Sequence, residues 1–157
     1  MSYFLERIFS TSATEPFSII FDKAGTFYGV EYESSNRVFK FQDDKLTYIA
    51  GSKTPGGREL GDVAAGDGGP AKEARFNGMH DLTLHPDGRL FVADTFNRRI
   101  RVIDLKTNTI STLGGGKLRF ESPYTVDLHP DGNYLVVADL DNRQVLEIDL
   151  KELSMKA

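Results

Sequence analysis

The sequence has no cysteine and no tryptophan among its 157 residues. Without cysteine there are no disulfides, no thiolate metal sites and no cysteine nucleophile. No hydrophobic run approaches the ~18 residues that span a bilayer. Lys and Arg never cluster beyond the pair Arg98-Arg99, and the net charge is −4, so we do not expect nucleic-acid binding. These absences exclude several classes of protein without naming a function.

The amino-terminal residues 1–10 lack the basic and apolar regions of a signal peptide, and Glu6 interrupts them. This pattern predicts a cytoplasmic location by default. The alternative is an exported protein whose signal has been removed. The length fits one domain, residues 1–157, and the 15 glycines predict many turns.

The chain repeats itself. Residues 79–100 and 123–145 share an alternating apolar segment, a His-Pro-Asp-Gly turn, the segment Leu-x-Val-Ala-Asp and an Asn-Arg pair. A looser copy covers residues 16–38, and the turn glycines Gly88 and Gly132 lie 44 residues apart. Alternation indicates strands, and Pro-Asp-Gly indicates tight turns. Four strands in a period of about 40–45 residues are typical of a β-propeller blade. The sequence therefore predicts an all-β fold of three four-stranded blades.

The shared pattern resembles the NHL repeat. The segment Gly66-Asp-Gly-Gly-Pro-Ala71 is similar to the inter-blade loop of a bacterial subset of these propellers. The resemblance covers about residues 14–150 and implies half of a six-bladed propeller. It is specific for fold and says little about function, because one fold carries many functions.

The repeat divides the chain into segments. Residues 1–13 are predicted to form an outer strand, 52–75 a long inter-blade loop and 151–157 a tail. The blades are predicted at residues 14–51, 76–116 and 117–150, the last without its outer strand. The long loop is expected to end in one helical turn that begins at Pro70 and is capped by Asp67.

Three blades cannot close a ring, since propellers typically have about four to eight. We therefore expect two chains to associate head to tail, with residues 1–13 of each completing the last blade of its partner. Such a homodimer closes six blades about a two-fold axis and leaves no open end. A piece cut from a longer propeller is the alternative.

The recurring polar residues are expected to build the blades. Asp94 and Arg99 are predicted to pair across the turn between the second and third strands of a blade. The full set of predicted structural residues is Asn36, Arg37, Asp94, Asn97, Arg99 and Asn142.

His80 is the strongest functional candidate. It begins an inner strand beside Asp81, where a propeller channel opens, and Phe17 and Tyr124 hold the matching positions in the other copies. A neutral histidine can bind a metal or act as a general base. The candidate ligand-binding residues at the channel mouth and rim are Phe17, Glu31, His80, Asp81, Tyr124, Asp139 and Asp141.

Two functions follow. The first is a module that binds a protein, a peptide or a small ligand at the channel mouth, with no cofactor. The second, which a likeness to gluconolactonase-type propellers implies, is a hydrolase or lyase that uses a divalent cation such as Ca, Mn or Zn. No P-loop, nucleophile elbow or HExxH motif occurs, and no catalytic residue is assigned.

Overall fold

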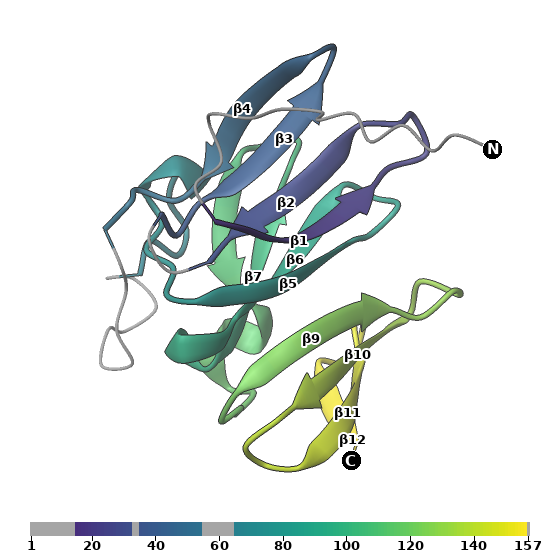
Figure 1. Cartoon of the computed structure of the whole chain (residues 1–157). Coiled ribbons are helices and arrows are strands. Elements are labelled where there is room, and N and C mark those ends of the chain that lie inside the picture. The colour runs from purple at the N-terminus through teal and green to yellow at the C-terminus, as the bar shows by residue number, and fades with distance from the viewer. Residues whose placement is uncertain (1–14, 33–34, 55–64, 157) are drawn as a thin grey trace, which may run out of the picture.

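The structure, a computed structural model, describes residues 15–32, 35–54 and 65–156 as three four-stranded antiparallel sheets (Figure 1). Blade 1 contains β1 (Pro16–Phe21), β2 (Phe27–Glu31), β3 (Val38–Gln42) and β4 (Lys45–Ala50). Blade 2 contains β5 (Met79–Leu84), β6 (Arg89–Asp94), β7 (Arg99–Asp104) and β8 (Thr109–Thr112). Blade 3 contains β9 (Pro123–Leu128), β10 (Tyr134–Asp139), β11 (Gln144–Asp149) and β12 (Ser154–Lys156). In each blade the strands follow one another in chain order, so the predicted all-β fold of three four-stranded sheets is confirmed.

The turn between the first two strands of each blade forms as the sequence indicates. Gly25, Gly88 and Gly132 adopt positive φ angles of 86°, 97° and 78°, which favour glycine. A preceding aspartate accepts a backbone N–H within the turn: Asp22 from Ala24 and Thr26, Asp87 from Arg89, and Asp131 from Asn133. Each turn therefore returns the chain along its own sheet.

The blades pack face to face around their first strands. β5 contacts β1 on one side and β9 on the other (Figure 1). One buried apolar cluster lies between blades 1 and 2 and a second between blades 2 and 3, with residues such as Val30 and Leu82 in the first and Phe91 and Val126 in the second. The first strands of the three blades therefore lie side by side, with β5 in the middle. We call the end at which β1, β5 and β9 begin the channel mouth.

Blade 3 has a fourth strand, contrary to the expectation of a blade that ends at residue 150 followed by a tail. β12 pairs with Glu147–Asp149 of β11. The turn before it copies the turn of blade 2, because Asp149 accepts the N–H groups of Lys151 and Glu152 as Asp104 accepts those of Lys106 and Thr107. Leu153 takes the left-handed conformation that Asn108 takes in blade 2, and a leucine there hid the turn from sequence reasoning.

The loop between blades 1 and 2 contains the predicted single turn of helix, the 3-10 helix η1 (Ala71–Glu73) with Pro70 as its N-cap residue. No side chain caps this turn, so the predicted role of Asp67 is wrong. Two further 3-10 turns are η2 (Thr95–Asn97) and η3 (Leu113–Gly116). Within the described residues no helix is long and apolar enough to cross a membrane. The strand expected at 1–13 lies outside the described residues.

Candidate functional site

The channel mouth carries a group of rings centred on His80. The His80 imidazole lies 4.0 Å from the ring centroid of Tyr124 and 4.9 Å from that of Phe17. Tyr32, which follows β2, and Phe96, in η2, lie 4.9 Å and 5.7 Å from it. The structure thus brings together the three predicted residues from β1, β5 and β9 and adds two aromatic residues from loops. We call these five residues the aromatic cluster.

Sequence reasoning missed Tyr32 and Phe96. Each follows the recurring acid that ends the second strand of its blade, Tyr32 directly after Glu31 and Phe96 two residues after Asp94. The available signal was an aromatic residue within two positions of the acid that ends the second strand of a blade. The loops that begin there surround the channel mouth.

The protonation of His80 follows from its contacts. Its Nδ1 lies 2.9 Å from the carbonyl oxygen of Gly78 and 2.9 Å from the Thr95 hydroxyl, and that hydroxyl donates its proton to the carbonyl of Pro123 at 2.7 Å. Both neighbours of Nδ1 are therefore acceptors, which places the ring proton on Nδ1. Burial lowers the pKa of His80, so the ring is neutral near pH 7.

Neutral His80 presents the lone pair of Nε2 as a hydrogen-bond acceptor. Nε2 has no hydrogen-bond partner among the described residues. The His80 side chain is buried, whereas Phe17 is 49% exposed. The site can therefore stack a flat ligand against aromatic faces and accept one hydrogen bond from it.

Asp81 lies beside the cluster but is already engaged. Its Oδ1 accepts the Ser18 hydroxyl at 2.7 Å and its Oδ2 accepts the backbone N–H of Val126 at 3.0 Å. Because Ser18 is in β1 and Val126 in β9, Asp81 joins the inner strands of all three blades. Asp81 therefore holds neighbouring blades together.

The other candidate acids do not gather at the mouth. Glu31 is fully buried and accepts the Arg37 guanidinium at 3.1 Å and the Tyr48 hydroxyl at 2.9 Å. Burial and then this contact with Glu31 raise the pKa of Tyr48 to about 12. Asp139 is fully buried and accepts the N–H groups of Glu121 and Ser122 and the amide of Asn142, while Asp141 is exposed in the loop after β10. Across 15–32, 35–54 and 65–156, no three His, Asp or Glu side chains meet as a metal site would require.

The predicted pairing of Asp94 with Arg99 needs correction. Asp94 accepts the amide of Asn97 and the backbone N–H of Asn77 at 2.8 Å, as expected of a turn-building aspartate. The guanidinium that faces it belongs to Arg101, at 3.5 Å, whereas Nε of Arg99 donates to the carbonyl of Asn97. Arg99 and Arg101 lie on the same face of β7, two residues apart, but Arg101 is fully buried with Asp94, whereas Arg99, at the start of the strand, is partly exposed.

In blade 1 the polar residues shift by one position. Val38 pairs with Val30 as Ile100 pairs with Ala93, so Ser35 takes the place of Asn97. Asn36 therefore adopts the left-handed conformation, with φ of 51°, and its side chain accepts the N–H of Gly78 at 3.0 Å. Asn36 thus links blade 1 to the start of β5, and Arg37 holds Glu31.

Arg101 also fastens the inter-blade loop. Its fully buried guanidinium donates to Asp67 at 2.6 Å and to the carbonyl of Ala65 at 3.1 Å, and Asp67 accepts the N–H of Thr112 at 2.8 Å. The sequence signal for Arg101 was a charged residue at a core-facing strand position, where Leu146 stands in blade 3. The Gly-Asp-Gly-Gly loop is therefore fixed to blade 2 by an ion pair.

These features define a propeller module of three repeated blades. No protein-family model matches the chain. The chain is 32% identical over 129 residues to NHL repeat-containing protein 3 of Homo sapiens, and equally to that of Mus musculus, across 80% of this chain and 33% of each relative. A shorter match, 40% identical over 62 residues, is to Teneurin-1 of Mus musculus. The comparisons support the assignment of the repeats to the NHL-repeat family, and the chain spans about a third of the length of the NHL relatives.

Solved structures show the same fold at low sequence identity. The chain matches a chain of a nidogen/laminin complex with a TM-score of 0.69 at 15% identity, over 96% of this chain and 49% of the other. It matches virginiamycin B lyase from Staphylococcus aureus with a TM-score of 0.62 at 16% identity, over 93% of this chain and 41% of the enzyme. At these identities the likeness extends to the fold alone. The finer likeness of the GDGGPA loop to a bacterial subset stays a prediction.

Proposed function

We propose that the chain is a propeller module that binds a protein, peptide or small ligand through the aromatic cluster at its channel mouth. The supporting observation is the free acceptor Nε2 of neutral His80 inside a ring of four aromatic side chains. Such a site suits a flat group that stacks on the rings and donates one hydrogen bond. The metal-dependent hydrolase is not favoured, because Glu31, Asp81 and Asp139 are held by protein donors.

A pair of flat probes tests this role. Indole has an N–H donor, and N-methylindole has the same ring without it. We expect indole to shift the His80 ring resonances saturably in NMR titrations, and N-methylindole to bind at least about tenfold more weakly. His80→Phe, which copies Phe17 of blade 1, should remove this difference, and His129→Phe, on the opposite turn, should retain it. Equal binding of both probes to the unaltered protein contradicts the proposal.

We also propose that two copies of the chain complete the ring by packing the outer face of blade 3 against the outer face of blade 1. The supporting observation is a difference in burial between matching residues. In blade 2, Leu82 and Ile100 are 1% and 0% exposed, because each faces a neighbouring blade. Ile19 and Val145 hold the same positions at the two ends of the chain and are 51% and 61% exposed. The end faces therefore match the two sides of an existing blade interface.

This dimer does not exchange strands between its two copies, because β12 of the same chain already pairs with the outer edge of β11. Face packing makes a different prediction. Val145→Lys should abolish self-association in sedimentation experiments, since it places a charge in the new interface. Leu140→Lys is the matched control, because Leu140 is 58% exposed in a loop. Equal effects of the two substitutions would contradict packing through these faces.

A further inference from the structure

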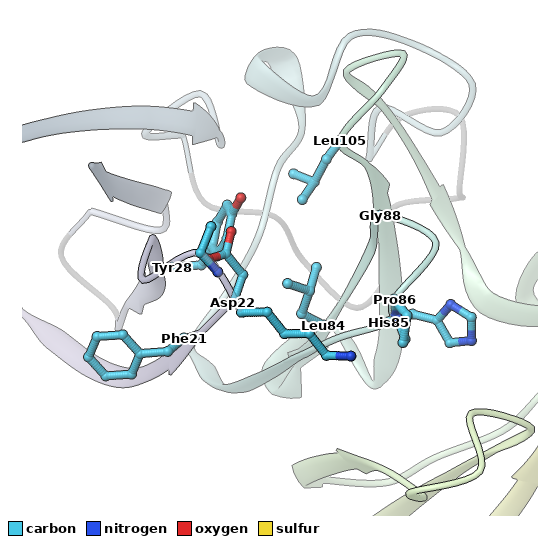
Figure 2. A pocket seen from close by; sticks show the side chains of 10 residues that line it. Phe21, Asp22, Tyr28, Leu84, His85, Pro86, Gly88 and Leu105 are labelled. Carbon is cyan, nitrogen blue, oxygen red and sulfur yellow. The ribbon is translucent and has the colours of Figure 1, made fainter. Parts of the chain in front are cut away.

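A second candidate site lies on the opposite side of the blades from the aromatic cluster, between the turns of blades 1 and 2. It is a groove of about 520 Å³, a size that suits a small ligand. Figure 2 shows its walls, which come from the β1–β2 turn, the β5–β6 turn and the residue after β7. The lining side chains used below are Asp22, Lys23, Tyr28, Leu84, His85 and Leu105.

The equivalent junction between blades 2 and 3 is closed by a histidine. Nε2 of His85 lies 3.0 Å from the carbonyl oxygen of Gly132, in the turn of the next blade. Figure 2 shows the imidazole turned away from the groove, toward that junction. The chain therefore contains a planar N–H donor that spans one junction and binds the turn carbonyl across it.

At the junction of blades 1 and 2 that donor is missing. Asp22 holds the position of His85, and its Oδ1 turns back to accept the N–H groups of Ala24 and Thr26 at 2.9 Å each. The carbonyl of Gly88 accepts the backbone N–H of Leu105 at 3.0 Å, and in the described structure no side chain of the β1–β2 turn takes its second acceptor position. The groove therefore has room for a donor from outside this pair of blades.

Two acceptors face the open groove. The Tyr28 side chain is 8% exposed, yet its hydroxyl has no hydrogen-bond partner among the described residues. Burial and then the charge of Asp22 raise the pKa of Tyr28, and both residues line the groove. Oδ2 of Asp22 likewise has no hydrogen-bond partner among the described residues. The groove therefore offers a carboxylate oxygen, a hydroxyl and the turn carbonyl between the apolar side chains of Leu84 and Leu105.

We propose that this groove binds a planar nitrogen cation, a guanidinium or amidinium group, in place of the imidazole that closes the next junction. The flat group fits between the apolar walls, and its N–H donors meet Asp22, Tyr28 and the carbonyl of Gly88. A guanidinium matches this set better than an ammonium, because its several N–H donors lie in one plane and can reach separate acceptors while its flat face lies against apolar side chains. The proposal does not involve the aromatic cluster and stands or falls separately from it.

Isothermal titration calorimetry, which measures the affinity of each of two matched compounds, tests the proposal. N-acetyl-L-arginine methylamide carries the guanidinium, and the citrulline compound replaces it with a neutral urea of the same shape. We expect the arginine compound to bind at least about tenfold more tightly, because hydrogen bonds to a charged group are the stronger ones. Benzamidine serves as the second probe. Tighter binding of benzamidine assigns the site to small aromatic amidines, and tighter binding of the arginine compound assigns it to a peptide side chain.

Three substitutions locate the site. Asp22→Asn keeps the acceptor for the turn but removes the charge, and it should lower the affinity about tenfold or more. Asp22→His should close the groove as His85 closes the next junction, abolishing binding without loss of thermal stability. Lys23→Met should strengthen binding, since it removes a positive charge from the wall. Equal binding of the arginine and citrulline compounds, or full affinity in both Asp22 variants, overturns the proposal.

Discussion

The buried guanidinium of Arg101 allows a stability prediction with a built-in comparison. Arg101→Leu copies Leu146, which holds the same position in blade 3. The substitution removes the ion pair with Asp67 and the longer contact with Asp94, both made by a fully buried side chain. Breaking a buried pair by removing one partner typically costs about 3–5 kcal/mol. We expect about 3 kcal/mol, because Asp94 keeps its bonds from Asn77 and Asn97 and Asp67 is 14% exposed.

A double-mutant cycle separates the pair from the packing. Asp67→Asn alone should cost about 1–2 kcal/mol, since the Arg101 charge loses its nearest partner. Combined with Arg101→Leu it should add little, giving a coupling energy of about 1–2 kcal/mol. Urea unfolding followed by circular dichroism at one fixed protein concentration measures each free energy.

Arg99→Leu is the control, because Arg99 is the residue that the sequence suggested as the partner of Asp94. Its loss should cost about 1 kcal/mol or less, since Arg99 is partly exposed. The reasoning is refuted if the two arginine variants lose the same stability, or if the effects of Asp67→Asn and Arg101→Leu are additive.

Three further predictions concern single residues. Gly29→Ala should destabilise the fold by about 1–3 kcal/mol in urea titration, because its Cβ would lie 2.3 Å from Cζ of buried Phe39; an unchanged midpoint contradicts this contact. Leu153→Asn should raise the unfolding free energy by about 0.5–1 kcal/mol, since Leu153 has a φ of 51° where blade 2 uses Asn108; calorimetry that finds a loss would refute it. The folded pKa of His80 is lowered, so the unfolded chain takes up the proton first and the unaltered protein should lose stability relative to His80→Phe as the pH falls through about 6.5. If the unfolding free energies of the two proteins change in parallel between about pH 7 and 5, the lowered pKa of buried His80 is contradicted.

The fold could be predicted from the sequence because each blade has a recognisable local pattern of residues. Alternating apolar residues give the strands, and the aspartate and glycine of each turn fix the reversal through local bonds and a positive φ. The missed strand β12 shows the limit of this reasoning. Its turn has a leucine in a left-handed conformation, and only the side-chain bonds of Asp149 to the following N–H groups reveal that the chain turns there.

The candidate site was only partly predictable. Phe17, His80 and Tyr124 share one repeat position, so their meeting at the mouth follows from the repeat itself. The loops bring in Tyr32 and Phe96, and loop conformation depends on contacts between blades that no local pattern records. The same limit applies to the groove of Figure 2, which exists because Asp22 bonds to its own turn where His85 reaches across to the next.

The mass of the protein in solution tests ring completion most directly. The chain has a mass of 17.5 kDa, and light scattering coupled to size-exclusion chromatography reports the assembled mass independently of shape. Packing of blade 3 on blade 1 of a second copy predicts one species of twice the chain mass, which Val145→Lys converts to a single chain. A stable monomer of the unaltered protein, or an open-ended series of larger species, would contradict the closed ring.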